Sequence, residues 1–113
     1  MRYVLWGLFA IAAGVVLYYS LIPGPGGGPF TWWDKFQHFA AYAVLSTLAG
    51  LAARSWREAL LFAVLLASAG YVIEIAQLYV GRSYDLDDEA ANALGCLAGF
   101  IASRVIVAAR SRI

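Results

Sequence analysis

Ionisable and amide side chains lie inside long apolar runs of this chain. Glu74 is near the end of one run, His38 near the start of another and Asn92 near the start of a third. Such groups are costly to keep in a bilayer, so they are expected to face other helices or a water-filled pocket. A carboxylate and an imidazole held together suit proton transfer or ligand binding. We therefore expect the three side chains to share one polar layer.

The run around His38 adds a carboxylate and a phenol to the same helix face. Asp34 and Tyr42 lie four residues before and after His38, close to the helical repeat. A carboxylate in this position can hold one ring nitrogen and so select the tautomer. We interpret His38 as a candidate general acid or base, and Asp34 and Tyr42 as ligand-binding candidates.

The other two runs extend the layer. Gln77 follows Glu74 by three residues, and Asn92 follows Asp88 by four. Glu74 and Asp88 are candidate catalytic residues, and Gln77 and Asn92 are ligand-binding candidates. Simpler structural explanations also exist: Glu74 could form an ion pair within the bundle, and Asn92 could bond between helices.

Charged residues near the ends of the apolar runs are expected to form a rim above this layer. Arg82 is a candidate fork for an anionic headgroup or phosphate, and Lys35 adds a point charge. Asp85 is a further ligand-binding candidate. Asp85 and Asp87 also suit the N-cap and first turn of a helix, where the helix dipole favours acids.

Composition points to a membrane protein. The chain has 113 residues, of which 63% are hydrophobic and 13% are charged. A soluble fold of this size could not bury so much apolar surface, so residues 1–113 are expected to form a single integral membrane domain. The net charge of +1 indicates no nucleic-acid partner. Cys96 is the only cysteine, which excludes a metal site built from several thiolates.

Four runs are long enough to cross the hydrocarbon core of about 30 Å. They cover about residues 3–22, 34–53, 58–80 and 87–109. We predict an all-α, four-helix transmembrane bundle. Gly95 and Gly99 form a GxxxG pair, which predicts a helix-packing face and a candidate homodimer contact.

The distribution of charge predicts the orientation. Six basic residues belong to the N-terminus, the second link and the C-terminal end: Arg2, Arg54, Arg57, Arg104, Arg110 and Arg112. Only Lys35 and Arg82 lie at the other end. The positive-inside rule then places both termini in the cytoplasm. The polar layer is thus expected to face the outer side of the membrane.

The ordered set of polar motifs resembles the VanZ-like membrane proteins. In chain order the motifs are Asp34-Lys35-x-x-His38-Phe39-x-x-Tyr42, Glu74-x-x-Gln77, and Arg82-x-x-Asp85-x-x-Asp88-x-x-x-Asn92-x-x-Gly95-x-x-x-Gly99. They cover three of the four expected helices. The resemblance implies a small multi-pass protein of the bacterial envelope. Some members of the family are linked to resistance to the glycopeptide teicoplanin.

Three functions fit the residues. The first is binding of an anionic amphiphile, either a membrane lipid or a lipid-linked envelope precursor. The second is a membrane enzyme that uses acid/base chemistry on a lipid-linked phosphate or acyl group, with a divalent ion held by Glu74, Asp88, His38 and Asn92 as one version. The third is a non-catalytic scaffold or a proton-coupled transporter. The sequence names no cofactor.

Overall fold

A computed structural model describes residues 1–22, 32–81 and 86–112. Within these residues the chain is all-α, as predicted. The elements are α1 (Arg2–Leu21), α2 (Trp32–Ala52), α3 (Trp56–Gln77), the short 3-10 helix η1 (Leu78–Val80) and α4 (Leu86–Arg110). These bounds lie close to the four expected ranges, and the third range continues through η1 to Val80.

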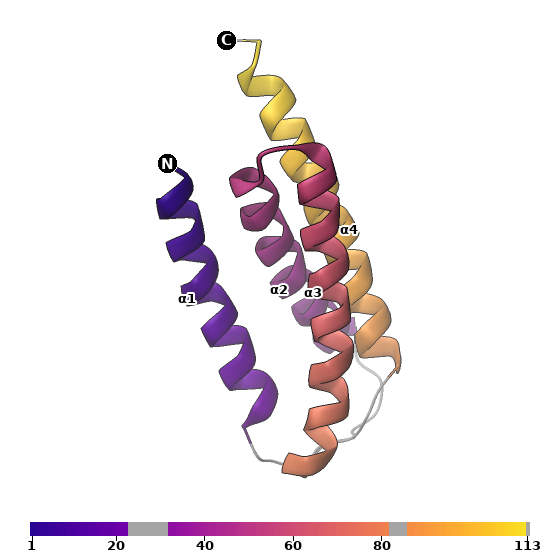
Figure 1. The fold of residues 1–113 in the computed structure, drawn as a ribbon. Helices are drawn as coiled ribbons and strands as arrows, with labels where there is room; N and C mark the ends of the chain where they lie inside the picture. The colour runs from indigo at the N-terminus through magenta and orange to yellow at the C-terminus, as the bar shows by residue number, and fades with distance from the viewer. Residues whose placement is uncertain (23–31, 82–85, 113) are drawn as a thin grey trace.

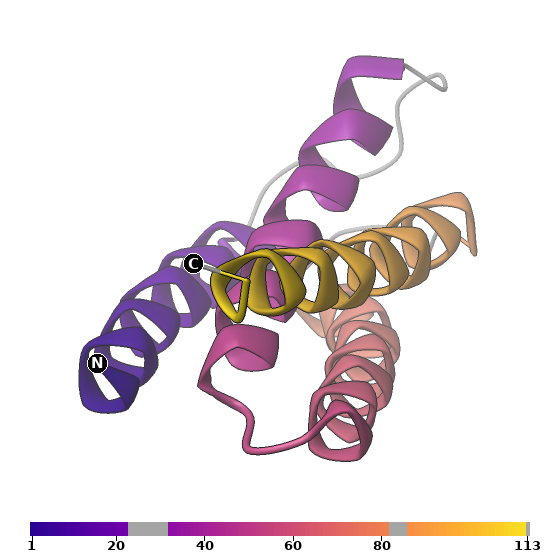
Figure 2. The ribbon, with the colours of Figure 1, turned by 90° about the horizontal axis from the view of Figure 1, so that it is seen from above.

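The helices run alternately up and down along the long axis of the molecule. Both termini and the link between α2 and α3 lie at the upper end in Figure 1. The starts of α2 and α4 and the ends of α1 and α3 therefore lie at the lower end. Figure 2, which looks down the bundle, shows α1 on one side and α3 on the other. α2 contacts α1, α3 and α4, and its contact with α4 is the most extensive.

Small residues allow the close approach of α2 and α4. Gly95 and Gly99 are buried on α4. A Cβ atom on Gly99 would lie 2.5 Å from the backbone oxygen of Ala43 and 2.6 Å from Cβ of Ser46. Ser46 Oγ donates a hydrogen bond of 2.7 Å to the backbone oxygen of Cys96. The GxxxG face therefore packs against α2 of the same chain, and a homodimer through this face would have to displace α2.

Two arginines from neighbouring helices satisfy carbonyl groups at the C-terminal end of α2. The last turn of α2 has no basic residue of its own. Arg2 Nε donates to the backbone oxygen of Ala52 at 2.8 Å, and Arg104 Nη2 donates to that of Gly50 at 2.5 Å. These bonds pair backbone acceptors that the helix itself leaves unsatisfied. They join α1, α2 and α4 at the end of the bundle that carries both termini.

Among the residues that the structure describes, three of the four α-helices are long and apolar enough to cross a membrane: α1, α3 with η1, and α4. α2 was also expected to be a span of this kind, but it does not meet the same measure of apolarity. Its first two turns carry Asp34, Lys35 and His38. Because α2 packs against the other three helices, more of its surface faces protein, where polar side chains can find partners.

Candidate functional site

The first turns of α2 and α4 bring an ammonium group between two carboxylates. Lys35 Nζ lies 2.6 Å from Asp88 Oδ1 and 3.3 Å from Asp34 Oδ2. Lys35 is buried, with 8% of its surface exposed. The sequence predicts Lys35 on an open rim beside an anionic ligand. Its charge is instead balanced inside the bundle, because the close packing of α2 on α4 places Asp88 beside it.

His38 lies one helical turn further along α2, against the same carboxylates. Its Nδ1 is 3.1 Å from Oδ1 of Asn92 on α4. An amide oxygen only accepts hydrogen bonds, so Nδ1 carries the hydrogen and donates it. Nε2 lies 3.5 Å from Asp88 Oδ2 and 4.0 Å from Asp34 Oδ1. Nε2 is therefore the ring atom available for exchange of a proton or for a ligand.

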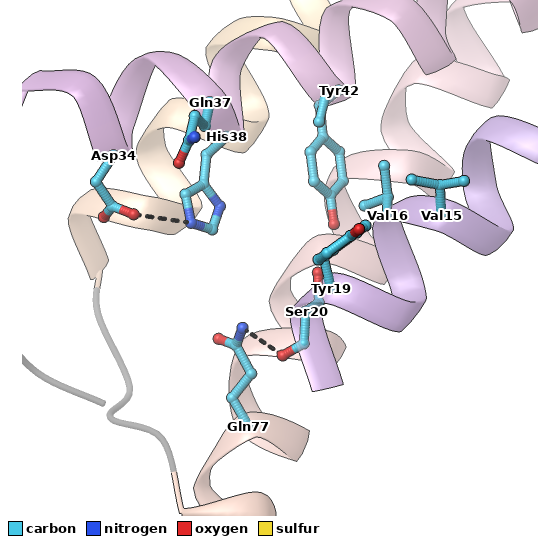
Figure 3. Close-up of a pocket in the computed structure, with 10 residues that line it drawn as sticks. Val15, Val16, Tyr19, Ser20, Asp34, Gln37, His38, Tyr42 and Gln77 are labelled. Atoms are coloured by element: carbon cyan, nitrogen blue, oxygen red, sulfur yellow. Dashed lines mark hydrogen bonds and ion pairs between the residues drawn. The ribbon is translucent and has the colours of Figure 1, made fainter. Parts of the chain in front are cut away.

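A cavity of about 420 Å³ opens between α1, α2 and α3, beside this cluster (Figure 3). Asp34 and His38 form part of one wall, and Tyr42 points from α2 toward α1. α1 contributes Val15 and Val16. The remaining lining residues are Tyr19, Ser20, Gln37, Ala41 and Gln77. The cavity thus joins hydrogen-bonding groups at the polar end of the bundle to an apolar wall.

Gln77, one of the expected ligand-binding residues, also has a structural contact. Its Nε2 donates a 2.9 Å hydrogen bond to the backbone oxygen of Ser20 (Figure 3). That oxygen belongs to the last turn of α1, where backbone acceptors need partners from outside the helix. Gln77 therefore ties the end of α3 to the end of α1 and closes the cavity on that side.

Glu74 is one of the buried polar residues of α3. It is 1% exposed and interacts electrostatically with the Tyr42 hydroxyl. The hydrogen bond and ion pairs of His38 go to Asn92, Asp34 and Asp88. Of the three candidate catalytic residues, His38 and Asp88 thus lie together, while Glu74 belongs to a second polar patch under Tyr42.

Glu89 is a member of this second patch that our sequence analysis missed. A Cβ atom on Gly70 of α3 would lie 3.3 Å from Glu89 Oε2, 3.1 Å from Asn92 Nδ2 and 3.1 Å from the Tyr42 ring. The side chains of Asn92 and Glu89 thus approach the same point of α3. Asn92, which is 1% exposed, therefore contacts His38 on one side and lies near Glu89 on the other.

The signal for Glu89 was present in the sequence. Glu89 lies three residues before Asn92 and seven before Cys96, both buried on α4. The acidic first turn of α4 concealed it, because acids there are also explained by the helix dipole. That explanation suits Asp87, which is exposed. Arg82 and Asp85, the other two expected site residues, lie outside the described residues.

These features define a small multi-pass membrane protein. At one end of its helical bundle lies a layer of polar side chains that are largely buried and form ion pairs or hydrogen bonds with one another. A model of the VanZ/LLP1 family matches residues 4–107, and the chain belongs to this family. The match confirms the resemblance seen in the ordered motifs. No curated protein and no solved structure matches the chain.

Proposed function

We propose that this protein binds an amphiphilic lipid of the cell envelope, with the headgroup in the cavity and the chains along α1. The observation that carries this proposal is the cavity itself, which combines Asp34, His38 and Gln77 with the apolar wall of Val15 and Val16. α1 has no buried residue and presents a largely apolar surface, which suits contact with acyl or prenyl chains.

The described lining favours a headgroup that donates hydrogen bonds. It offers a carboxylate, an imidazole, amides and hydroxyl groups, and the nearby ammonium of Lys35 is already paired with Asp88 and Asp34. A headgroup rich in hydroxyls, such as a glycosylated lipid, matches these acceptors. Binding of a phosphate, as expected from the sequence, would depend mainly on Arg82.

The location of the cavity supports a site on the outer side of a bacterial cytoplasmic membrane. The cavity lies at the end of the bundle opposite both termini, next to the start of α2. With the termini in the cytoplasm, as the basic residues predict, this end faces outward. A contribution to glycopeptide tolerance is proposed from the family resemblance alone.

A second candidate function, acid/base catalysis on the bound lipid, is favoured by one contact. His38 Nε2 lies near two carboxylates in the wall of the cavity, where a substrate group could reach it. In this version His38 would transfer the proton, and Asp88 would stabilise its charged form.

The test is native mass spectrometry of gently extracted protein, comparing two variants that add the same volume. Ala41→Phe fills the cavity, whereas Ala93→Phe adds its ring to an exposed position on α4. We expect a bound lipid in the wild type and in Ala93→Phe, and at least a tenfold smaller lipid-bound fraction in Ala41→Phe.

Equal lipid retention in the two variants, or no retained lipid in the wild type, would contradict the proposal. If Ala41→Phe does not fold, Gln37→Trp replaces it, because Gln37 lines the same cavity but is exposed. Catalysis is tested separately: His38→Gln should keep the lipid and stop its conversion.

A further inference from the structure

Asp34 and His38 on α2 and Asp88 on α4 each carry an atom that can bind a metal ion. Each offers one ligand atom, and these atoms all lie within 4.8 Å of one another. His38 Nε2 is 3.5 Å from Asp88 Oδ2 and 4.0 Å from Asp34 Oδ1. Metal–ligand bonds of about 2.0–2.2 Å place neighbouring ligand atoms about 3 Å apart, so an inward movement of these side chains would bring all three atoms within ligating distance of one ion.

Lys35 leaves this centre open because it uses the opposite oxygens. Its Nζ contacts Asp88 Oδ1 and Asp34 Oδ2, whereas Asp88 Oδ2 and Asp34 Oδ1 are the oxygens nearest His38. The ammonium group therefore orients both carboxylates through the oxygens that are not the nearest to His38. Partners that orient ligating groups in this way are a regular feature of protein metal sites.

The imidazole is held in the orientation that a metal ligand needs. Its Nδ1 donates to Asn92 Oδ1, and Asn92 is 1% exposed, so the donor side of the ring is anchored in the bundle. Nε2 of the neutral ring then lies beside two carboxylate oxygens, 3.5 Å from Asp88 Oδ2 and 4.0 Å from Asp34 Oδ1. A proton or a metal ion between these atoms would relieve the repulsion between the Nε2 lone pair and the oxygens.

We propose that Asp34 Oδ1, His38 Nε2 and Asp88 Oδ2 bind a divalent transition-metal ion. One nitrogen and two carboxylate oxygens suit Zn²⁺ or Mn²⁺ better than Mg²⁺ or Ca²⁺, which prefer oxygen ligands alone. The ligand set differs from the one considered from the sequence. Asp34 replaces Glu74, and Asn92 supports His38 instead of contacting the ion.

Asp34 and His38 also line the cavity, so further coordination positions of the ion would face it. Sites with such open positions bind water or a ligand group. The metal site does not depend on the proposed lipid, and ion binding can be measured on the protein after lipid removal.

The experiment is a titration of the purified full-length protein with Mn²⁺, followed by electron paramagnetic resonance. The signal of free Mn²⁺ should fall until one ion is bound, and electron spin echo of the bound ion should show modulation by an imidazole nitrogen. His38→Gln should remove this modulation. Asn92→Ala should weaken binding about 10–100-fold, because Asn92 orients the ligating ring.

Asp88→Asn and Asp87→Asn form the matched pair, since they make the same change at adjacent positions in the first turn of α4. We expect at least a tenfold loss of Mn²⁺ affinity in Asp88→Asn and none in Asp87→Asn. Equal affinities in this pair, bound Mn²⁺ without nitrogen modulation, or no saturable binding of Mn²⁺ or Zn²⁺ would overturn the proposal. Where His38→Gln or Asp88→Asn fails to fold, Asp34→Asn changes a ligand whose side chain is 47% exposed.

Discussion

At the scale of single residues, the burial of Lys35 is the most consequential contact of the polar layer. Its side chain is 10% exposed, and that of Asp88 is 13% exposed. Removing one partner of such a pair leaves a charge with neither water nor a counter-ion. The pair therefore holds the start of α2 to the start of α4 only while both residues are present.

We predict that Lys35→Met lowers the free energy of unfolding by about 3 kcal/mol. This is the lower end of the range for a broken buried ion pair, because Asp34, the second carboxylate beside Lys35, is partly exposed to water. The double variant Lys35→Met/Asp88→Asn should lose less than the sum of the two single changes. The measurement is equilibrium unfolding in detergent micelles followed by circular dichroism. Additive losses would show that the ion pair contributes no coupling energy, and Arg110→Met is the exposed control.

At the scale of the elements, the pairing of α2 with α4 depends on close backbone approach. A Cβ atom on Gly99 would meet the backbone oxygen of Ala43 at 2.5 Å and the backbone nitrogen of Thr47 at 2.8 Å. Neither atom can move without moving the helix. The two helices would have to separate, and the Lys35–Asp88 contact depends on the same pairing.

Gly99→Ala is therefore expected to destabilise the protein by about 1–3 kcal/mol, the usual cost of overpacking. Gly14→Ala on α1 is the matched control, since nothing lies within 4 Å of its added Cβ atom. Alanine there should be neutral or stabilise the helix by about 0.5–1 kcal/mol. Measured in the same detergent, the melting temperature of Gly99→Ala should fall below that of the wild type. The melting temperature of Gly14→Ala should stay unchanged or rise. Equal shifts would contradict the packing argument.

At the scale of the whole molecule, both termini lie at one end of the bundle (Figure 1), and the starts of α2 and α4, which carry the polar layer, lie at the other. Arg2 and Arg104 bond to the end of α2, so two of the basic residues that predicted the orientation also have a structural role. Other basic residues at that end remain exposed: Arg54, Arg57, Arg110 and Arg112. Their charge still favours a cytoplasmic location for the termini.

Cysteine labelling in intact cells tests this orientation. Cys96 is 2% exposed and is first replaced by alanine. A membrane-impermeant maleimide should label Tyr79→Cys, because Tyr79 lies at the end of the bundle that carries the polar layer. It should not label Ser111→Cys near the C-terminus. Permeabilising the membrane should make Ser111→Cys reactive. The reverse pattern of labelling would place the cavity in the cytoplasm.

The four helices and their approximate bounds could be predicted from the sequence, because apolar length and helical period are local properties of the chain. The same period correctly grouped Asp34 with His38 and Tyr42 along the cavity. Only the tertiary structure decided which side chains meet across helices. Lys35 turns inward and Glu89 joins the layer because the glycines of α4 and α3 allow close packing, which sets the relative rotation and separation of the helices. The relative rotation and separation of the helices depend on contacts between residues that are distant in the sequence. The periodicity of a single helix therefore cannot predict them.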